Sequence, residues 1–297
     1  MIIQSPHDTI LNMIEQHQTQ QPVGVFDSGV GGLSVLRAIR NELSSEDILY
    51  IGDQAHIPYG PRSKEQISVF AIAITQFLLD KGAKLIVVAC NTASAAALHN
   101  LRELFPDVPF VGMEPAIKPA AETTHTGKVG VLATPTTFAG ELYASVVERF
   151  AKDVSLYTST CPGLVELIEA GALDAPETHA ILKKALHPML AEGIDTIVMG
   201  CTHYPFVIPL IQSITGPEIH TIDPAPAIAR QTRRLLEKWN LLNKVESPGQ
   251  LKYFTSGDPC SFSAILSTLL GETGPVLQVT WDQDMILHTL PQLNQPD

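Results

Sequence analysis

Three pairs of similar segments recur along this chain in the same order and at nearly constant spacing. PVGVFDSG has a counterpart in KVGVLATP, KLIVVACNTAS has one in DTIVMGCTHYP, and GMEPAIKPA has one in TIDPAPAIA. The paired residues lie 106, 111 and 109 residues apart and are Gly24 and Gly130, Cys90 and Cys201, and Pro115 and Pro224. Chance similarity between buried strands could explain one pair, but three pairs in register indicate a duplicated α/β unit.

Apolar runs alternate with helical patterns throughout the chain. Short β-branched runs predict strands at 22–27, 47–52, 84–89, 108–113, 128–133, 154–158, 195–200 and 218–222, and a further strand-like stretch, LKYFTSG. Helical spacing predicts helices near 33–43, 63–80, 92–104, 116–124, 136–151, 163–170, 177–192, 206–214, 225–239 and 260–270. Ser63 and Gln66 have the spacing of a capping box. The alternation is typical of a mainly parallel sheet flanked by helices, so we expect an α/β protein.

Two proline-bearing segments, EPAIKP and DPAPA, divide the chain into two units. Proline disfavours a helical conformation in the residue before it, so both segments predict crossovers or hinges. We expect residues 22–115 and 225–297 to form a first α/β domain and residues 116–224 to form a second, pseudo-symmetric one. The active site should lie in the cleft between them. Residues 1–21 are expected to be a flexible extension, and residues 240–250 a surface loop.

The composition excludes several classes of protein. The net charge is −12 with only 19 lysines and arginines, and no basic stripe is present, so we expect no nucleic-acid partner. No apolar run reaches the roughly 18 residues of a membrane-spanning helix, and the first 21 residues lack the basic start of a secretory signal. The four cysteines include no Cys-x-x-Cys spacing, which favours free thiols in a reducing compartment. We therefore expect a cytoplasmic protein without a membrane partner.

Cys90 and Cys201 each follow a predicted buried strand at its carboxyl end. A single cysteine there is usually a small buried apolar residue, but the duplication and the polar residues that follow favour a functional pair. Ligands of open α/β sheets bind beyond the carboxyl ends of strands, so both thiols should reach one substrate from opposite sides. A free thiol has a pKa of about 8.5, so such a pair suits proton exchange at a stereocentre without metal or cofactor. Cys161 and Cys260 lack matching partners and are interpreted as structural.

Polar residues beside the cysteines suggest further roles. His203 could hold the balance between thiol and thiolate or polarise a substrate; a Cys/Cys/His zinc site is less favoured because no fourth ligand is evident. Asp27 would raise the pKa of a nearby thiol, so it is a better partner for a substrate ammonium group, for His203 or for water. Gly29, Gly31 and Gly32 do not form a dinucleotide-binding pattern, but they would let backbone amides approach a small anion.

Two loops carry weaker signals. The segment ATPTT supplies the hydroxyl groups of Thr134 and Thr137, which suit a substrate carboxylate, although helix capping is an equal alternative. Tyr59 and Gly60 lie between two prolines, which would stiffen a loop near the site, but such a turn is also ordinary loop chemistry.

Several strings of the sequence resemble the glutamate racemases of bacterial cell-wall synthesis. They are VFDSGVGGLSV, PYGPRS, VVACNTASA, VGMEPAIKPA, GCTHYPF and IDPAPAIA, and they cover about residues 22–240. The resemblance implies two α/β domains with a cleft between them. It also implies interconversion of L- and D-glutamate without pyridoxal phosphate or metal, which supplies D-glutamate for peptidoglycan synthesis.

The same resemblance implies roles for individual residues. Those that match the acid/base thiols and the groups that assist them are Cys90, Cys201, Asp27, His203 and Glu169. Those that match substrate-contacting groups are Asp27, Ser28, Tyr59, Gly60, Asn91, Thr92, Thr134, Thr137, Thr202 and His203. In this scheme Glu169 assists His203, and the threonine pair helps to hold a carboxylate. The chain departs from the family at His56, where arginine is common.

Two alternatives to a glutamate racemase stay open on the sequence alone. An aspartate or broad-specificity amino-acid racemase would share the two-thiol design, because the sequence does not show the pocket depth that selects chain length. A non-catalytic amino-acid-binding protein would share the two-domain form, although both thiols argue against it. An inhibitory role on a topoisomerase is disfavoured by the acidic charge. Family members are often homodimers, and extended ones are sometimes regulated by a cell-wall precursor, so we expect a small-molecule substrate and allow for a homodimer.

Overall fold

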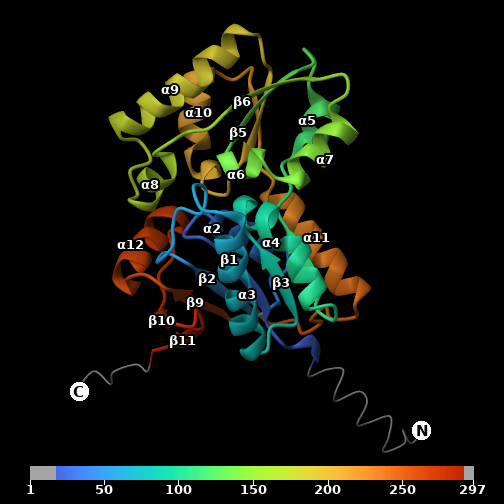
Figure 1. Ribbon diagram of the computed structural model, residues 1–297, viewed down its shortest axis with the longest axis vertical. Helices are drawn as coiled ribbons and strands as arrows, with labels where there is room; N and C mark the ends of the chain where they lie inside the picture. Colours follow the sequence, from blue (N-terminus) through green and yellow to red (C-terminus); the bar gives the residue numbers. More distant parts are fainter. Residues whose placement is uncertain (1–17, 291–297) are drawn as a thin grey trace, which may run out of the picture.

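The computed structural model describes residues 18–290, which form two sheets, one above the other along the long axis of the molecule (Figure 1). One sheet has seven strands and the other has four. All neighbouring strands pair in parallel except the last two of the chain. The predicted α/β class with mainly parallel sheets is therefore confirmed. Within the described residues, no helix is long and apolar enough to cross a membrane.

The seven-stranded sheet is covered by helices on both faces. From one edge to the other, its strands are β11 (Leu287–Thr289), β10 (Val276–Trp281), β9 (Leu251–Thr255), β2 (Ile48–Gly52), β1 (Val23–Asp27), β3 (Leu85–Val88) and β4 (Phe110–Gly112). The helices on one face are α2 (Leu33–Glu42), α11 (Ala225–Lys238) and α12 (Pro259–Leu270), and those on the other are α3 (Lys64–Asp80) and α4 (Asn91–Leu104). The central strands are buried along their whole length, as parallel strands between two helical layers must be.

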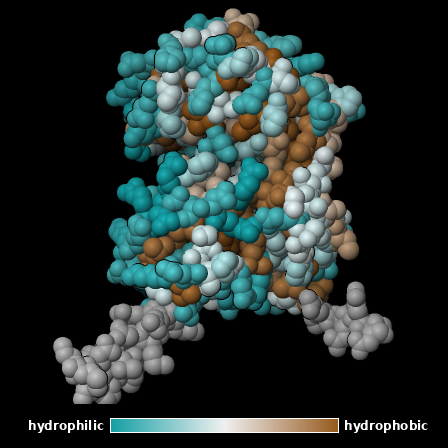
Figure 2. Space-filling view, turned by 180° about the vertical axis from the view of Figure 1, so that it is seen from behind, coloured by the Kyte–Doolittle hydropathy of each residue, from teal (hydrophilic) through white to brown (hydrophobic). Residues whose placement is uncertain are grey.

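The four-stranded sheet has the same layered construction. Its strands, in spatial order, are β6 (Ser155–Ser159), β5 (Lys128–Ala133), β7 (Thr196–Gly200) and β8 (His220–Ile222). The elements on one face are α8 (Leu164–Glu169), α9 (Pro176–Ala191), the 3-10 turn η1 (Tyr204–Val207) and α10 (Ile208–Thr215). The elements on the other are α5 (Ile117–Thr123), α6 (Pro135–Phe138) and α7 (Glu141–Phe150). Seen from behind, hydrophilic residues cover most of the surface of both units (Figure 2).

The chain crosses between the two sheets twice. It leaves the seven-stranded sheet after β4, builds the whole four-stranded sheet, and returns through α11, which packs against α2. The two proline segments lie at these crossings, because α5 begins at Ile117 and α11 begins at Ala225. We propose these crossings as the limits of the two domains, at residues 115 and 225.

Three predicted details need correction. The predicted helix at 136–151 is two helices, α6 and α7, separated near Gly140. Gly140 is the N-cap of α7 and has an extended backbone (φ −77°, ψ 142°), which ends the helical path, and a Cβ there would lie 2.9 Å from the Cβ of Ala95 on α4. The predicted helix at 206–214 begins two residues earlier, as η1. Strands β10 and β11 were not predicted, because Gln278 and Thr280 interrupt the apolar residues of β10 and β11 has only three residues.

Other predicted details are confirmed. The capping box of α3 is present, because the Ser63 hydroxyl and the Gln66 side chain each accept the other residue's backbone N–H. Residues 240–250 form neither helix nor strand, as expected for a surface loop. Residues 1–17, most of the predicted flexible extension, lie outside the described residues.

Candidate active site

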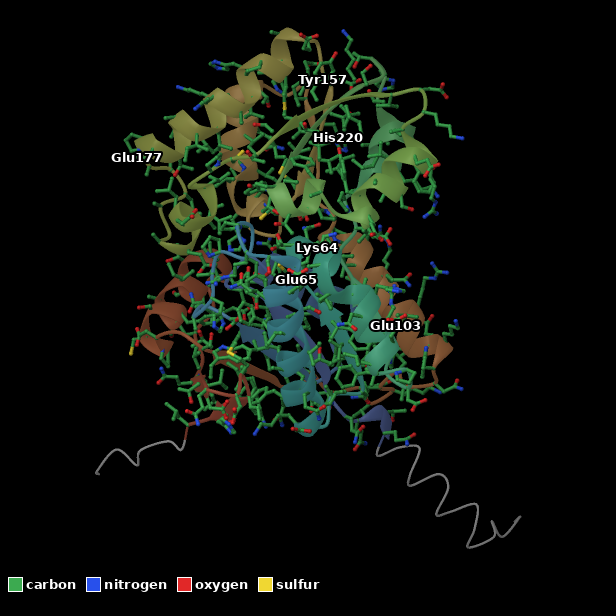
Figure 3. All side chains as sticks on the ribbon, viewed as in Figure 1. Lys64, Glu65, Glu103, Tyr157, Glu177 and His220 are labelled. Atoms are coloured by element: carbon green, nitrogen blue, oxygen red, sulfur yellow. The ribbon has the colours of Figure 1, made fainter. Side chains whose placement is uncertain are left out.

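The carboxyl ends of central strands from both sheets face one cavity of about 230 Å³. Ten of the thirteen predicted site residues line it, namely Ser28, Tyr59, Gly60, Cys90, Asn91, Thr92, Thr134, Cys201, Thr202 and His203. Asp27, Thr137 and Glu169 do not line the cavity but hydrogen bond to residues that do. Figure 3 shows Glu103 on α4 and Glu177 on α9 at the outer surface, away from the space between the sheets.

Cys90 follows β3 and is the N-cap residue of α4. Its Sγ accepts a hydrogen bond from the Ala93 N–H at 3.4 Å and lies 3.9 Å from the Ser28 hydroxyl. Burial raises the pKa of this thiol well above its ordinary value, and the neighbouring Asp27 carboxylate raises it further. Cys90 is therefore held as a neutral thiol, the form that donates a proton.

Cys201 directly follows β7 and reaches the cavity from the other sheet. Its Sγ lies 3.8 Å from Nδ1 of His203. Burial lowers the pKa of His203, but hydrogen bonds with Cys201 and Glu169 raise that pKa more, so the imidazole is held in its charged form. Cys201 thus has an imidazolium beside its sulfur, whereas Cys90 has the Asp27 carboxylate nearby. The two thiols of the cavity therefore have unequal surroundings.

Glu169 ends α8 and connects His203 to the seven-stranded sheet. Its Oε1 accepts hydrogen bonds from His203 Nε2 and from the Val30 N–H, both at 2.7 Å. Its Oε2 accepts one from the Gln54 amide at 2.9 Å. Burial raises the pKa of Glu169, but these hydrogen bonds and the charge of His203 lower it to below its ordinary value. Glu169 is thus an ionised partner for the imidazolium.

The loop between β1 and α2 has no room for side chains at its three glycines, and two of these lie against the His203–Glu169 pair. A Cβ at Gly29 would lie 2.1 Å from Glu169 Oε1, and a Cβ at Gly31 would lie 2.3 Å from His203 Nδ1. These glycines let the His203–Glu169 pair of the four-stranded unit pack directly against the backbone of the seven-stranded unit. The glycine pattern in the sequence thus reflects this close approach.

Asp27 is fully buried at the end of β1. Its Oδ2 accepts hydrogen bonds from the N–H groups of Gly29 and Gly32, at 3.2 and 2.9 Å, and its Oδ1 accepts one from the Thr202 hydroxyl at 3.4 Å. The N–H groups of Gly29 and Gly32 therefore bind this carboxylate of the protein itself. Burial raises the pKa of Asp27, and the charge of His203 offsets part of that rise.

A row of hydroxyl groups joins the two units at the cavity wall. Thr92 Oγ1 lies 2.9 Å from Thr134 Oγ1, which lies 2.9 Å from Thr137 Oγ1. Thr134 also caps α6 by accepting the Thr137 N–H, which confirms the helix-capping alternative, and it lines the cavity as well. Among the described residues, the buried side-chain amide of Asn91 has no hydrogen-bond partner. An unsatisfied buried group costs about 1–3 kcal/mol, so this wall suits a polar ligand.

Tyr59 is anchored by Asp53, a buried carboxylate that sequence reasoning missed. The Tyr59 hydroxyl donates to Asp53 Oδ2 at 2.6 Å, and the indole N–H of Trp281 donates to Oδ1 at 2.8 Å. His56 lies 3.0 Å from the same carboxylate and stacks on Phe70. The Tyr59 hydroxyl thus binds the protein while the residue lines the cavity.

Among the described residues, the Cys/Cys/His zinc site considered from the sequence is not formed. In the part of the chain that the structure describes, no group of three or more His, Cys, Asp or Glu residues is placed to hold a metal ion. All four cysteines are free. Cys161, interpreted as structural from the sequence, lines the cavity, and burial raises its pKa to about 12, so it is a neutral wall residue. Other wall residues that the sequence did not signal are Thr160, Val165, Glu166 and Tyr204.

The sequence and the fold are similar to known proteins over most of the chain. The family model described as Asp/Glu/Hydantoin racemase matches residues 23–232. The glutamate racemase of Ectopseudomonas mendocina is 52% identical over 261 residues, which cover 88% of this chain and 98% of that relative.

Two solved structures show the same similarity in three dimensions. Glutamate racemase isoform RacE1 of Bacillus anthracis has a TM-score of 0.78 at 34% identity, covering 87% of this chain and 97% of that one. The Escherichia coli glutamate racemase, in complex with L-glutamate and the activator UDP-MurNAc-Ala, has a TM-score of 0.75 at 33% identity. That match covers 91% of this chain and 100% of that one.

Proposed function

This chain belongs to the Asp/Glu/hydantoin racemase family, and we propose that it interconverts L- and D-glutamate by a two-thiol proton transfer at the α-carbon, without metal or organic cofactor. The observation that carries the proposal is the pair of buried thiols, Cys90 and Cys201, which line one cavity from two different sheets. A racemase removes a proton from one face of its substrate and returns one to the other. Two acid/base groups on opposing walls meet that need.

The reaction moves one proton across the cavity. One thiolate removes the α-proton and becomes a thiol, which leaves a carbanion-like intermediate. The other thiol then donates its proton to the opposite face of that carbon and becomes the thiolate. The roles of Cys90 and Cys201 exchange with direction. In this scheme His203, paired with Glu169, stabilises the thiolate of Cys201, and the charge of Asp27 favours the neutral form of Cys90.

The polar wall of the cavity supports binding of a carboxylate substrate. The unpartnered Asn91 amide and the hydroxyls of Thr92 and Thr134 supply donors at one side of the cavity. Fixed donors of this kind stabilise negative charge that develops in a transition state, each by about 3–4 kcal/mol. The residues that complete the proposed substrate contacts are Asp27, Ser28, Tyr59, Gly60, Thr137, Thr202 and His203.

The proposed product, D-glutamate, is a building block of peptidoglycan. The four free cysteines support a place in the reducing cytoplasm, where thiols persist. We propose that the protein forms a homodimer in solution, because family members are often dimers.

Proton exchange at the α-carbon tests the proposal directly. The reduced protein is incubated with L-glutamate in D₂O without added cofactor, and optical activity and α-deuterium are followed together. We expect loss of optical activity with incorporation of deuterium. A protein that merely binds amino acids would change neither, and faster exchange with aspartate than with glutamate would favour the aspartate or broad-specificity alternative.

Single cysteine variants test the mechanism. Cys90→Ala and Cys201→Ala should each abolish racemisation, because each leaves one face of the substrate without an acid/base group. Cys260→Ala, which removes an exposed thiol, is the matched control and should keep wild-type activity. Appreciable turnover in either single active-site variant would refute the two-thiol scheme.

A further inference from the structure

Two residues outside the predicted site extend the His203–Glu169 pair into a longer chain of hydrogen bonds. Gln54 follows β2 and donates its amide N–H to Glu169 Oε2 at 2.9 Å. Thr255 ends β9 and donates its hydroxyl to Gln54 Oε1 at 2.9 Å. The chain therefore runs from Thr255 through Gln54, Glu169 and His203 to Cys201.

The directions of the hydrogen bonds made by Thr255 and Gln54 are fixed by a backbone donor. The Gly257 N–H donates to Thr255 Oγ1 at 3.0 Å, so this hydroxyl accepts one bond and directs its own proton to Gln54. Because Gln54 Oε1 is used as the acceptor, only the NH₂ end of the amide can face Glu169. Thr255 is fully buried, which holds this arrangement away from competing water.

The chain of hydrogen bonds also crosses between the two units. Cys201, His203 and Glu169 belong to the four-stranded unit, whereas Gln54 and Thr255 belong to the seven-stranded unit. Glu169 Oε1 is held by His203 and Val30, and Gln54 holds the remaining oxygen. The orientation of this carboxylate therefore depends on both units being in contact.

We propose that Gln54 is a positioning residue for proton transfer at Cys201, acting by holding the Glu169 carboxylate against His203, and that Thr255 orients the Gln54 amide. The inference rests on the proposed racemisation and deepens it. Contact between the two units then orients the Glu169–His203 pair beside Cys201, and it also closes the cavity. The Gln54–Glu169 hydrogen bond involves a charged group. Loss of one such hydrogen bond should lower kcat about 10- to 100-fold.

The test is Gln54→Met, which keeps the side-chain length and removes both hydrogen bonds. The matched control is Gln76→Met on α3, whose exposed glutamine bonds only to Asp80 in the described structure. We expect kcat of Gln54→Met to fall about 10- to 100-fold, and the control to stay near wild type. Thr255→Val should show a smaller loss of the same kind, and the double variant should be no slower than Gln54→Met, because both act through one chain.

Isotope effects separate positioning from general damage to the fold. α-Deuterated L- and D-glutamate are compared in wild type and variants. Weakening Cys201 slows removal of the α-proton in one direction and return of a proton in the other. The deuterium effect on kcat should therefore rise for one enantiomer and fall for the other in Gln54→Met.

The outcomes are distinguishable. Opposite movement of the two isotope effects supports the proposal. If they move together, or if Gln54→Met stays within about threefold of the Gln76→Met control, Gln54 has no such role. If Gln54→Met fails to fold, Thr255→Val decides by the same isotope criterion. If the wild-type protein itself exchanges no α-proton of glutamate, the proposed function fails first and this inference falls with it.

Discussion

Replacement of Gly31 by alanine should disable the site while leaving the fold largely intact. A Cβ at this position would lie 2.3 Å from His203 Nδ1 and 2.7 Å from the Thr202 hydroxyl. Ordinary van der Waals contact begins near 3.4 Å, so the imidazole must move by about 1 Å to make room. Such a shift would break the geometry that joins His203 to Glu169 at 2.7 Å and to Cys201 at 3.8 Å.

The expected loss follows from that displacement. A misplacement of about 1 Å in a catalytic group can cost about 100-fold, so kcat of Gly31→Ala should fall at least about 100-fold. Stability should fall less, by about 1–3 kcal/mol, the usual cost of one added methyl group in a packed region. Gly31 does not have a positive φ, so alanine would not strain the backbone itself.

Steady-state racemisation, followed by circular dichroism, and urea unfolding measure the two effects separately. Gly274→Ala is the matched control, because the nearest atom to an added Cβ there is Tyr253 Cε2, at 3.9 Å. It should keep the activity and the stability of the wild type. If folded Gly31→Ala keeps more than about a third of the wild-type kcat, then the steric argument for His203 is refuted.

Two further predictions concern stability. Lys84 and Glu46 form a buried ion pair, and each side chain is 1% exposed. Lys84→Met should therefore lower the free energy of unfolding, measured by urea denaturation, by about 3–5 kcal/mol, because it leaves the Glu46 charge buried without a partner. Adding Glu46→Leu should restore part of this loss. An unaltered unfolding midpoint in the single variant would contradict this. Burial raises the pKa of Asp195, but hydrogen bonds from Thr124, Thr126 and His125 lower it to about 2. A depressed carboxyl pKa stabilises the fold above the unfolded pKa of about 3.9, and this stabilisation is lost as pH falls toward 2. Asp195→Asn should therefore destabilise the protein at pH 7 and have little effect near pH 2; an equal effect at both pH values would be inconsistent with the pKa shift.

The positions of the two thiols could be predicted from the sequence because they depend on local rules. Cys90 and Cys201 each follow a short apolar strand, and the carboxyl ends of parallel strands meet at one edge of a sheet. The duplicated segments indicated that the chain contains two such sheets, each with a cysteine at this edge. The position of His203 in the site could be predicted for the same reason, since it lies two residues after Cys201.

The groups that hold the site together could not be found in this way. Glu169 was identified only through family resemblance, since it meets His203 across 34 residues. Gln54 lies 115 residues from Glu169, and Trp281 lies 228 residues from Asp53, with no motif to connect them. The sequence likewise did not reveal that Gly140, at the break between α6 and α7, lies against Ala95 of another helix.

The unequal surroundings of the two thiols have a kinetic consequence. L- and D-glutamate have equal free energies in water, so the equilibrium constant between them is one. The values of kcat/KM for the two enantiomers must then be equal, however differently Cys90 and Cys201 are built. The asymmetry can appear only as a difference in kcat that is matched by an equal proportional difference in KM. One enantiomer should have both the higher kcat and the higher KM, by the same factor.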